Sequence, residues 1–295
     1  MIELPDEKWT PYVTVVGIGE LGVRVLLKLR EKHRDDLNLC AIVSDKSQIA
    51  GRENQISTIC VEDVDTIDQL SALCDVIQNG IFLVVADMAE VFSAKVLSVI
   101  ASCAAEQNLA YLAALLITPD ANEGTGDNIA QTRVICMTTE MLRRQCRLQP
   151  KLFEDEFDVV AETTMGIVTM RRHNLIGFDV ADMQEALSRP GKMAAVFGQG
   201  NTAENTVDNL LLAAKKIGID IRRCELAVFS MSGASKRLTV FEVHEAFRLM
   251  AEKTGREPDS LSGDSMTLLS APLDDSLGDK LKILAVFCKG RNRSK

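Results

Sequence analysis

Short apolar runs alternate with longer amphipathic stretches along most of the sequence. The runs at 12–16, 39–43 and 81–86 are rich in Val, Ile and Leu, a composition typical of strands buried in a parallel sheet. Amphipathic stretches at 23–30 and 92–106 follow the first and third of these runs. This order predicts an α/β protein in which helices connect the strands of a parallel sheet.

The rest of the chain carries further elements of both kinds. Additional strands are predicted at 55–60, 109–117, 225–231, 265–272 and 281–288. Additional helices are predicted at 139–146, 154–172, 181–187, 203–217 and 239–254. The segment 130–136 fits either a helix end or a strand.

A glycine turn stands between the first predicted strand and its helix. Gly17, Gly19 and Gly22 form a G-x-G-x-x-G pattern, and this spacing lets backbone N–H groups approach a phosphate at a helix N-terminus. The pattern fits a dinucleotide-binding fold, a tubulin-type nucleotide fold or a tight turn without a ligand. Asp45, after the second predicted strand, fits a ribose-binding acid or a helix cap.

Two carboxylates, Asp179 and Asp182, stand at the start of the predicted helix 181–187. Aspartate is common there because it caps free backbone N–H groups and interacts favourably with the helix dipole. The surrounding run at 175–183, Leu-Ile-Gly-Phe-Asp-Val-Ala-Asp-Met, resembles the catalytic (synergy) loop of FtsZ, the bacterial relative of tubulin. Gly177 stands where that family has asparagine, and a turn predicted at 195–200 stands where it has Gly-x-Gly.

The resemblance extends over roughly residues 12–290 and implies an FtsZ/tubulin-like fold. It implies a Rossmann-like parallel-sheet domain of the nucleotide-binding type at 1–152 and a central helix at 153–174. A smaller α/β C-terminal domain is expected at 175–295.

The resemblance also assigns roles to the residues of both motifs. In FtsZ the two acids reach the nucleotide pocket of the next subunit along a filament, so Asp179 and Asp182 are expected to act catalytically in trans. The glycine turn and Asp45 fall at the nucleotide site of the chain itself. The expected partners are FtsZ-like subunits or further copies of this chain, through longitudinal contacts.

The expected nucleotide site departs from the FtsZ pattern. FtsZ has a glycine-rich phosphate loop after its second strand, whereas Gly51 is the only glycine between residues 46 and 79 here. In FtsZ the strand matching 81–86 runs into Gly-Gly-Gly-Thr-Gly-Thr-Gly, whereas 87–94 contain no glycine. Asp87 and Glu90 instead place negative charge where a polyphosphate would bind, and like charges repel strongly near a protein surface.

The guanine-reading positions are also altered. A Phe and an Asn near the start of the central helix hold guanine in FtsZ. Phe153 falls at the first position and Phe157 at the second, so the amide that reads guanine is missing. Phe153 is itself expected to be a core residue, since phenylalanine is usually buried.

Composition excludes several classes of function. The chain has 295 residues and a net charge of −9, which argues against nonspecific nucleic-acid binding. Its eight cysteines are scattered singly without a C-x-x-C pair, so reduced thiols in a cytoplasmic protein are expected and a metal site is not. No apolar run approaches the ~18 residues of a membrane span.

These observations leave three hypotheses open. The first is an FtsZ-like protein that neither binds nor hydrolyses GTP in its own pocket, has no cofactor, and acts as a modulator or cap of FtsZ-like polymers or assembles without nucleotide. The second is a cell-division GTPase with a remodelled GTP pocket. The third is a dinucleotide-binding oxidoreductase that uses the glycine turn and Asp45 with NAD or FAD, and it explains nothing in the C-terminal half.

Overall fold

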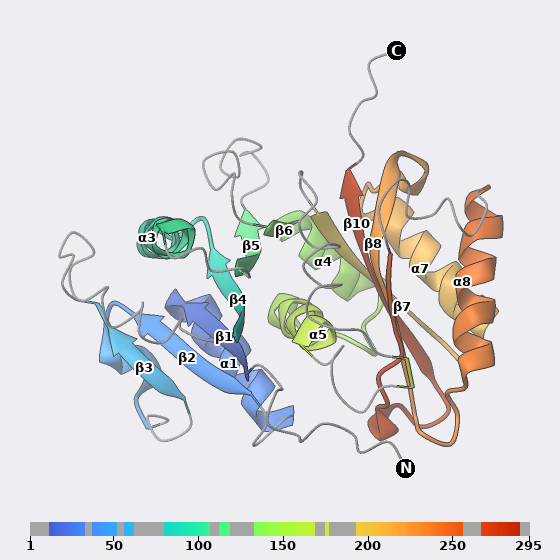
Figure 1. Ribbon diagram of the computed structural model, residues 1–295, viewed down its shortest axis with the longest axis horizontal. Helices are drawn as coiled ribbons and strands as arrows, with labels where there is room; N and C mark the ends of the chain where they lie inside the picture. Colours follow the sequence, from blue (N-terminus) through green and yellow to red (C-terminus); the bar gives the residue numbers. More distant parts are fainter. Residues whose placement is uncertain are drawn as a thin grey trace, which may run out of the picture. The chain divides into compact units, whose positions relative to one another are not determined.

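The computed structural model describes residues 12–32, 37–51, 56–61, 80–106, 112–118, 133–168, 175–176, 193–255 and 267–289. The chain divides into two compact units, residues 1–112 and 113–295 (Figure 1). We call them unit 1 and unit 2. The domain boundaries expected from the sequence, at 152 and 174, differ from this division and stay a prediction.

Unit 1 contains a parallel sheet with the strand order β3-β2-β1-β4. Its elements are β1 (Tyr12–Ile18), α1 (Gly19–Lys32), β2 (Asn38–Val43), the 3-10 helix η2 (Lys46–Ile49), β3 (Ser57–Cys60), β4 (Gly80–Asp87) and α3 (Val91–Glu106). Helix α1 buries Val25, Leu26 and Leu29, because residues three and four apart lie on one helical face. Since the strands are parallel, their carboxyl ends meet at one edge of the sheet, and the glycine turn lies there.

Unit 2 contains a mixed sheet with the order β5-β6-β7-β10-β8-β9, in which β10 is antiparallel to both β7 and β8. Its strands are β5 (Leu112–Thr118), β6 (Arg133–Thr138), β7 (Met193–Gly200), β8 (Cys224–Gly233), β9 (Leu268–Ser270) and β10 (Leu281–Lys289). Its helices are α4 (Thr139–Leu148), α5 (Glu156–Val168), α7 (Ala203–Lys216) and α8 (Val240–Thr254), with 3-10 helices η6 (Ile221–Arg223) and η8 (Asp275–Leu277). The ambiguous segment at 130–136 therefore contributes a strand, β6.

Helices cover both faces of β10. Leu281, Ile283 and Phe287 belong to the core that the sheet shares with α7 and α8. The alternate residues face α5, where Leu284 lies against Gly166 and the Lys282 ammonium pairs with Glu162. This alternation follows from the two-residue period of a strand. No helix among the described residues combines the length and apolar character needed to cross a membrane.

The turn predicted at 195–200 is wrong, because these residues belong to strand β7. A Cβ on Gly198 would lie 2.7 Å from the Cβ of Leu210, and one on Gly200 would lie 2.7 Å from the Thr206 nitrogen. The glycines therefore allow α7 to approach the strand closely, which is a known use of glycine within strands.

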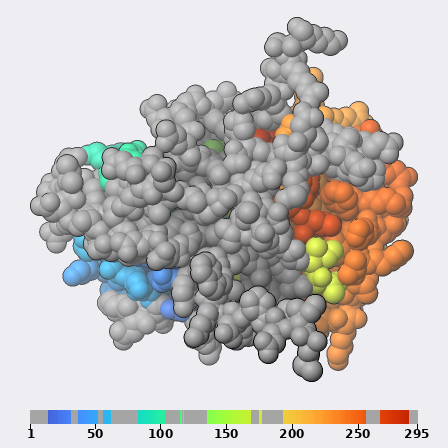
Figure 2. All heavy atoms as spheres, viewed as in Figure 1, coloured from blue at the N-terminus to red at the C-terminus, as the bar shows by residue number. Residues whose placement is uncertain are grey.

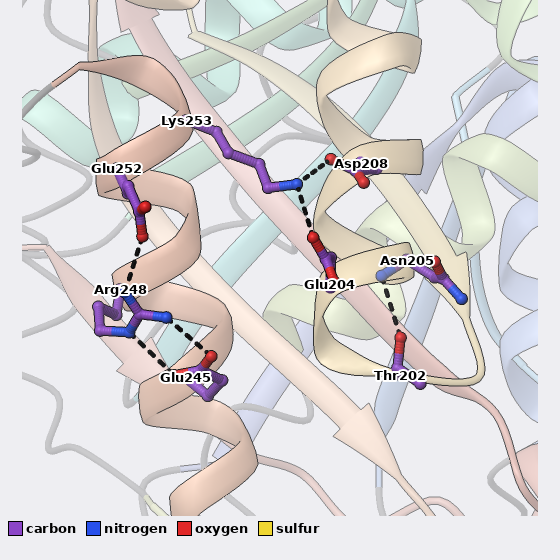
Figure 3. Close-up of polar contacts among 8 residues, drawn as sticks. All are labelled: Thr202, Glu204, Asn205, Asp208, Glu245, Arg248, Glu252 and Lys253. Carbon is purple, nitrogen blue, oxygen red and sulfur yellow. Dashed lines mark hydrogen bonds and ion pairs between the residues drawn. The ribbon is translucent and has the colours of Figure 1, made fainter.

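Helices α7 and α8 are joined at their surfaces by ion pairs (Figure 3). Lys253 of α8 lies 2.7 Å from Asp208 and 3.3 Å from Glu204, both on α7. Arg248 pairs along α8 with Glu245 and Glu252. Because each pair has at least one largely exposed member, these pairs contribute little to stability beside the apolar core beneath them.

Candidate functional site

The glycine turn connects β1 directly to α1 by a close backbone contact. A Cβ on Gly17 would lie 2.6 Å from the carbonyl carbon of Gly22, and a Cβ on Gly22 would lie 2.6 Å from the Cα of Gly17. Gly19 has φ +68, a conformation that side chains other than glycine rarely adopt. Packing and backbone conformation thus require all three glycines, whether or not a ligand binds.

The carboxylate of Glu90 covers Gly19. A Cβ built on Gly19 would overlap Oε2 of Glu90 and would lie 2.7 Å from Oγ of Ser93. Ser93 is fully buried, and its Oγ lies 2.6 Å from Glu90 Oε2 and 3.4 Å from the Ile18 carbonyl. A hydroxyl has one proton, so the shorter contact defines the hydrogen bond, and Ser93 donates it to the carboxylate.

The turn after β4 carries Glu90 toward the glycine turn. Oδ1 of Asp87 accepts a hydrogen bond from the Ala89 nitrogen at 2.8 Å, and the Asp87 carbonyl accepts one from the Glu90 nitrogen at 3.2 Å. Asp87 thereby forms a turn with its own backbone, as aspartate commonly does. The two acids flagged by the sequence accordingly have different roles: Asp87 shapes the turn and Glu90 lies over Gly19.

Asp45 acts as a helix cap at the end of β2. Its Oδ1 accepts a hydrogen bond from the Ser47 nitrogen at 2.8 Å and caps the 3-10 helix η2. This bond holds the pKa of Asp45 below its usual value, because it favours the charged carboxylate. The helix-cap role therefore accounts for an aspartate at position 45 without a bound ribose. The Asp45 side chain is exposed to solvent.

The described part of the carboxyl-end edge of unit 1 carries three acids, Asp45 after β2 and Asp87 and Glu90 at the end of β4. A phosphate near Gly19 would meet the carboxylate of Glu90, and two like charges about 4 Å apart repel by about 1 kcal/mol in water and about 4 kcal/mol near a protein surface. Among the described residues there is no cluster of acids, histidines or cysteines that could hold a metal ion.

No protein-family model and no curated protein matches the sequence, but solved structures match nearly the whole chain. The FtsZ W319Y mutant of M. jannaschii matches with a TM-score of 0.76 and 16% identity, covering 96% of this chain and 92% of that one. The GTPγS-bound protofilament of CetZ2 from Haloferax volcanii matches with a TM-score of 0.62 and 15% identity, covering 96% of this chain and 94% of that one. TubZ of Clostridium botulinum phage c-st matches with a TM-score of 0.57 and 13% identity, covering 95% of this chain and 93% of that one.

The chain has the FtsZ/tubulin fold. The α/β architecture expected from the sequence, with a parallel-sheet part followed by a second α/β part, is confirmed. At these low identities the likeness establishes the fold, while the roles of individual residues rest on the geometry of this chain.

Most of the synergy-like stretch lies outside the described residues, including Asp179 and Asp182, and the catalytic role of these acids stays a prediction. Its first two residues are described. The Leu175 nitrogen donates to the Ala271 carbonyl at 2.9 Å, and the Ala271 nitrogen donates to the Ile176 carbonyl at 3.0 Å. The stretch thus begins against the end of β9.

Exposed apolar side chains gather at that end of unit 2. Leu175, Leu273, Val240 and Phe241 are large apolar residues that remain open to solvent, and Phe241 is 78% exposed. Leu175 and Leu273 lie beside the end of β9, and Val240 and Phe241 begin α8. A bridge between Gly233 and Leu273 joins the ends of β8 and β9. Figure 2 shows α8, in orange, open along one flank of unit 2. Exposed aromatic and apolar groups of this kind are typical anchors for protein contacts.

Phe153, the residue at the guanine position of the resemblance, is a core residue as expected. It is 2% exposed and its ring meets Phe197 edge to face, with centroids 5.2 Å apart. A buried ring in this arrangement has no free face for a base.

Sequence reasoning missed Ser93 and the contact between Glu90 and Gly19. The available signal was the spacing of Glu90 and Ser93, three residues apart across the start of a predicted helix, which puts both side chains on one face. The approach of Glu90 to Gly19 joins residues far apart in the chain and depends on the turn after β4, which periodicity does not specify.

Replacing Gly22 with alanine is expected to destabilise the protein by about 1–3 kcal/mol. Alanine is intrinsically better in a helix by about 0.5–1 kcal/mol, but its Cβ would collide with backbone atoms of Gly17 that cannot rotate away. Urea unfolding followed by circular dichroism measures the change. The matched control is Glu20→Ala in the same helical turn, which is exposed and should change stability by less than about 0.5 kcal/mol. Equal stabilities of the two variants would contradict the close contact.

Proposed function

We propose that this protein is an FtsZ-like assembly protein that neither binds nor hydrolyses GTP in its own pocket. It acts through filament-type protein–protein contacts, as a modulator or cap of FtsZ-like polymers in the cytoplasm or by assembling without nucleotide. The observation that carries the proposal is the Glu90 carboxylate over Gly19, held by the buried Ser93 hydroxyl.

Two further observations support the proposal. The glycine turn, which would otherwise be the strongest indication of a nucleotide site, has a sufficient reason in the fold itself, since Gly17 and Gly22 lie backbone to backbone and Gly19 has a positive φ. The apolar end of unit 2 around Phe241 offers a surface for a protein partner. A protein of the same fold, CetZ2, has been solved as a protofilament, so the fold is compatible with longitudinal assembly.

Titration with GTP in a calorimeter tests the proposal. The purified protein is expected to contain no extractable nucleotide and to bind GTP more weakly than about 1 mM, whereas FtsZ of M. jannaschii serves as a positive control under the same conditions. Micromolar binding of GTP would overturn the proposal in favour of a remodelled GTPase. Tight binding of NAD or FAD would favour an oxidoreductase instead.

The proposed action on a polymer depends on Asp179 and Asp182. If these acids meet a neighbouring subunit, the double variant Asp179→Ala/Asp182→Ala should unfold at the same temperature as the wild type. In a pelleting assay, the variant should no longer change the mass of FtsZ polymer as the wild type does. If they only cap a helix, the variant should lose about 0.5–2 kcal/mol of stability per cap and keep its effect on the polymer.

A further inference from the structure

A cationic face lies on unit 2 where α4 passes the end of α7. It consists of Arg143, Arg144 and Arg147 of α4 and Lys215 and Lys216 of α7. Residues three and four apart share one side of a helix, so the three arginines lie together on the outer side of α4. The Arg144 guanidinium donates a hydrogen bond to the Lys216 carbonyl at 3.1 Å, which places the two helices side by side.

The cationic face has an excess of positive charge. Two of its arginines pair with carboxylates: Arg143 lies 3.0 Å from Glu156, and Arg144 lies 2.7 Å from Glu140. The other three members form no ion pair within the described part of the chain. Arg147, Lys215 and Lys216 are thus exposed cations without an acid partner among the described residues, in a protein whose net charge is −9. Such a concentration against the overall charge favours an anionic partner.

An exposed leucine adjoins these cations. Leu212 of α7 is 49% exposed and precedes Lys215 and Lys216 by three and four residues, so all three side chains share one side of α7. The combination of one apolar side chain with surrounding cations is selective for a partner that has an apolar group among carboxylates.

Helix ends explain only part of this arrangement. Cations in the last turn of a helix interact favourably with its dipole, and Lys215, Lys216 and Arg147 occupy such positions. The dipole does not account for Arg143, for the bond that joins α4 to α7, or for the exposure of Leu212.

We infer that the cationic face binds an acidic segment of a partner protein, with an apolar side chain of that segment against Leu212. Arginine forks pair well with carboxylates, as Arg143 and Arg144 do within this chain with Glu156 and Glu140. Membrane-surface helices insert several apolar residues, and single-stranded nucleic acids stack on aromatic rings. The cationic face has one leucine and no ring. This inference does not depend on the proposed function.

Fluorescence anisotropy with a labelled peptide tests the inference. The probe is a short peptide with one leucine flanked on both sides by glutamates, and it is expected to bind with a dissociation constant of about 100 μM or tighter at low ionic strength. Added salt should weaken the binding because the face is exposed. A second peptide with serine in place of the leucine should bind about 3–10-fold more weakly, since it loses the apolar contact.

Charge-reversal variants locate the site. Arg147→Glu/Lys216→Glu should weaken peptide binding by at least about tenfold, while Lys236→Glu/Lys280→Glu changes the net charge equally at exposed positions outside the face and should keep most of the affinity. Leu212→Ser should abolish the preference for the leucine peptide. Thermal unfolding curves confirm that each variant is folded.

Several outcomes would overturn the inference. They are the absence of peptide binding, equal losses in the two charge-reversal variants, and retention of the leucine preference by Leu212→Ser. Tighter binding of anionic lipid vesicles or of a single-stranded oligonucleotide than of the peptide would assign the face to another class of partner.

Discussion

Replacing Lys282 with methionine should lower the free energy of unfolding by about 3–5 kcal/mol. The Lys282 ammonium lies 2.7 Å from Glu162, and the two side chains are only 13% and 8% exposed. Removing the cation alone would take a positive charge from beside the buried Glu162 carboxylate in the interface between α5 and β10. The ammonium also lies 3.9 Å from the Asp274 carboxylate, so the same substitution removes a cation shared by two acids.

Urea unfolding of a double-mutant cycle measures this effect. Lys282→Met/Glu162→Leu should recover most of the lost stability, because replacing a whole buried pair by apolar groups of similar size is often neutral or stabilising. Arg248→Met is a suitable control, since Arg248 also pairs with glutamates but is exposed, and its loss should cost less than about 1 kcal/mol. A cost below about 1 kcal/mol for Lys282→Met would contradict the role of Lys282 in compensating the buried Glu162 carboxylate.

The repeating strands and helices could be predicted because apolar periodicity reports directly on which faces are buried. The first strand, the glycine turn and the first helix follow one another in sequence, so their connection needs no tertiary information. Helix α8 begins at Val240 after a Thr239 cap, close to the predicted start at 239. By contrast, the Lys282–Glu162 pair could not be predicted, since the two residues are far apart in the chain and nothing local marks them as partners.

Glycine was the least reliable guide to local structure. Gly198 and Gly200 predicted a turn, because glycine is frequent there, yet they lie in β7 where α7 packs tightly. The same ambiguity applies to Gly17 and Gly22, whose pattern is typical of phosphate binding but whose backbones touch. Only the residues that pack against a glycine in the folded protein show whether the space beside it is open to a ligand or filled by another backbone segment.

The sequence predicted which acids follow β4 in unit 1, but it did not predict where their side chains lie. The absence of glycines at 87–94 and the presence of Asp87 and Glu90 could be read from the sequence. The placement of Glu90 over Gly19 depends on the hydrogen bond that Asp87 makes within the turn and on the buried Ser93. Long-range approach of this kind is set by tertiary packing, which local propensity does not encode.

Replacing Phe153 with alanine is expected to cost about 3–5 kcal/mol of stability, as for other buried aromatic residues. The ring is 2% exposed and packs edge to face on Phe197 at a centroid distance of 5.2 Å, so its removal leaves a cavity and also loses the aromatic pair. If Phe153 instead held a guanine base, as the resemblance to FtsZ implies for this position, its ring would need an open face and the variant would lose nucleotide affinity rather than stability.

Thermal and urea unfolding of Phe153→Ala, with and without GTP, separates these two roles. The control is Phe241→Ala, which removes the same group from a 78% exposed position and should change stability by less than about 0.5 kcal/mol. A ligand that binds only the folded state raises its stability in proportion to RT ln(1 + [L]/Kd), so GTP should shift neither wild type nor variant. A GTP-dependent increase in the stability of the wild type that Phe153→Ala abolishes would place the ring in a nucleotide site and contradict its assignment to the core.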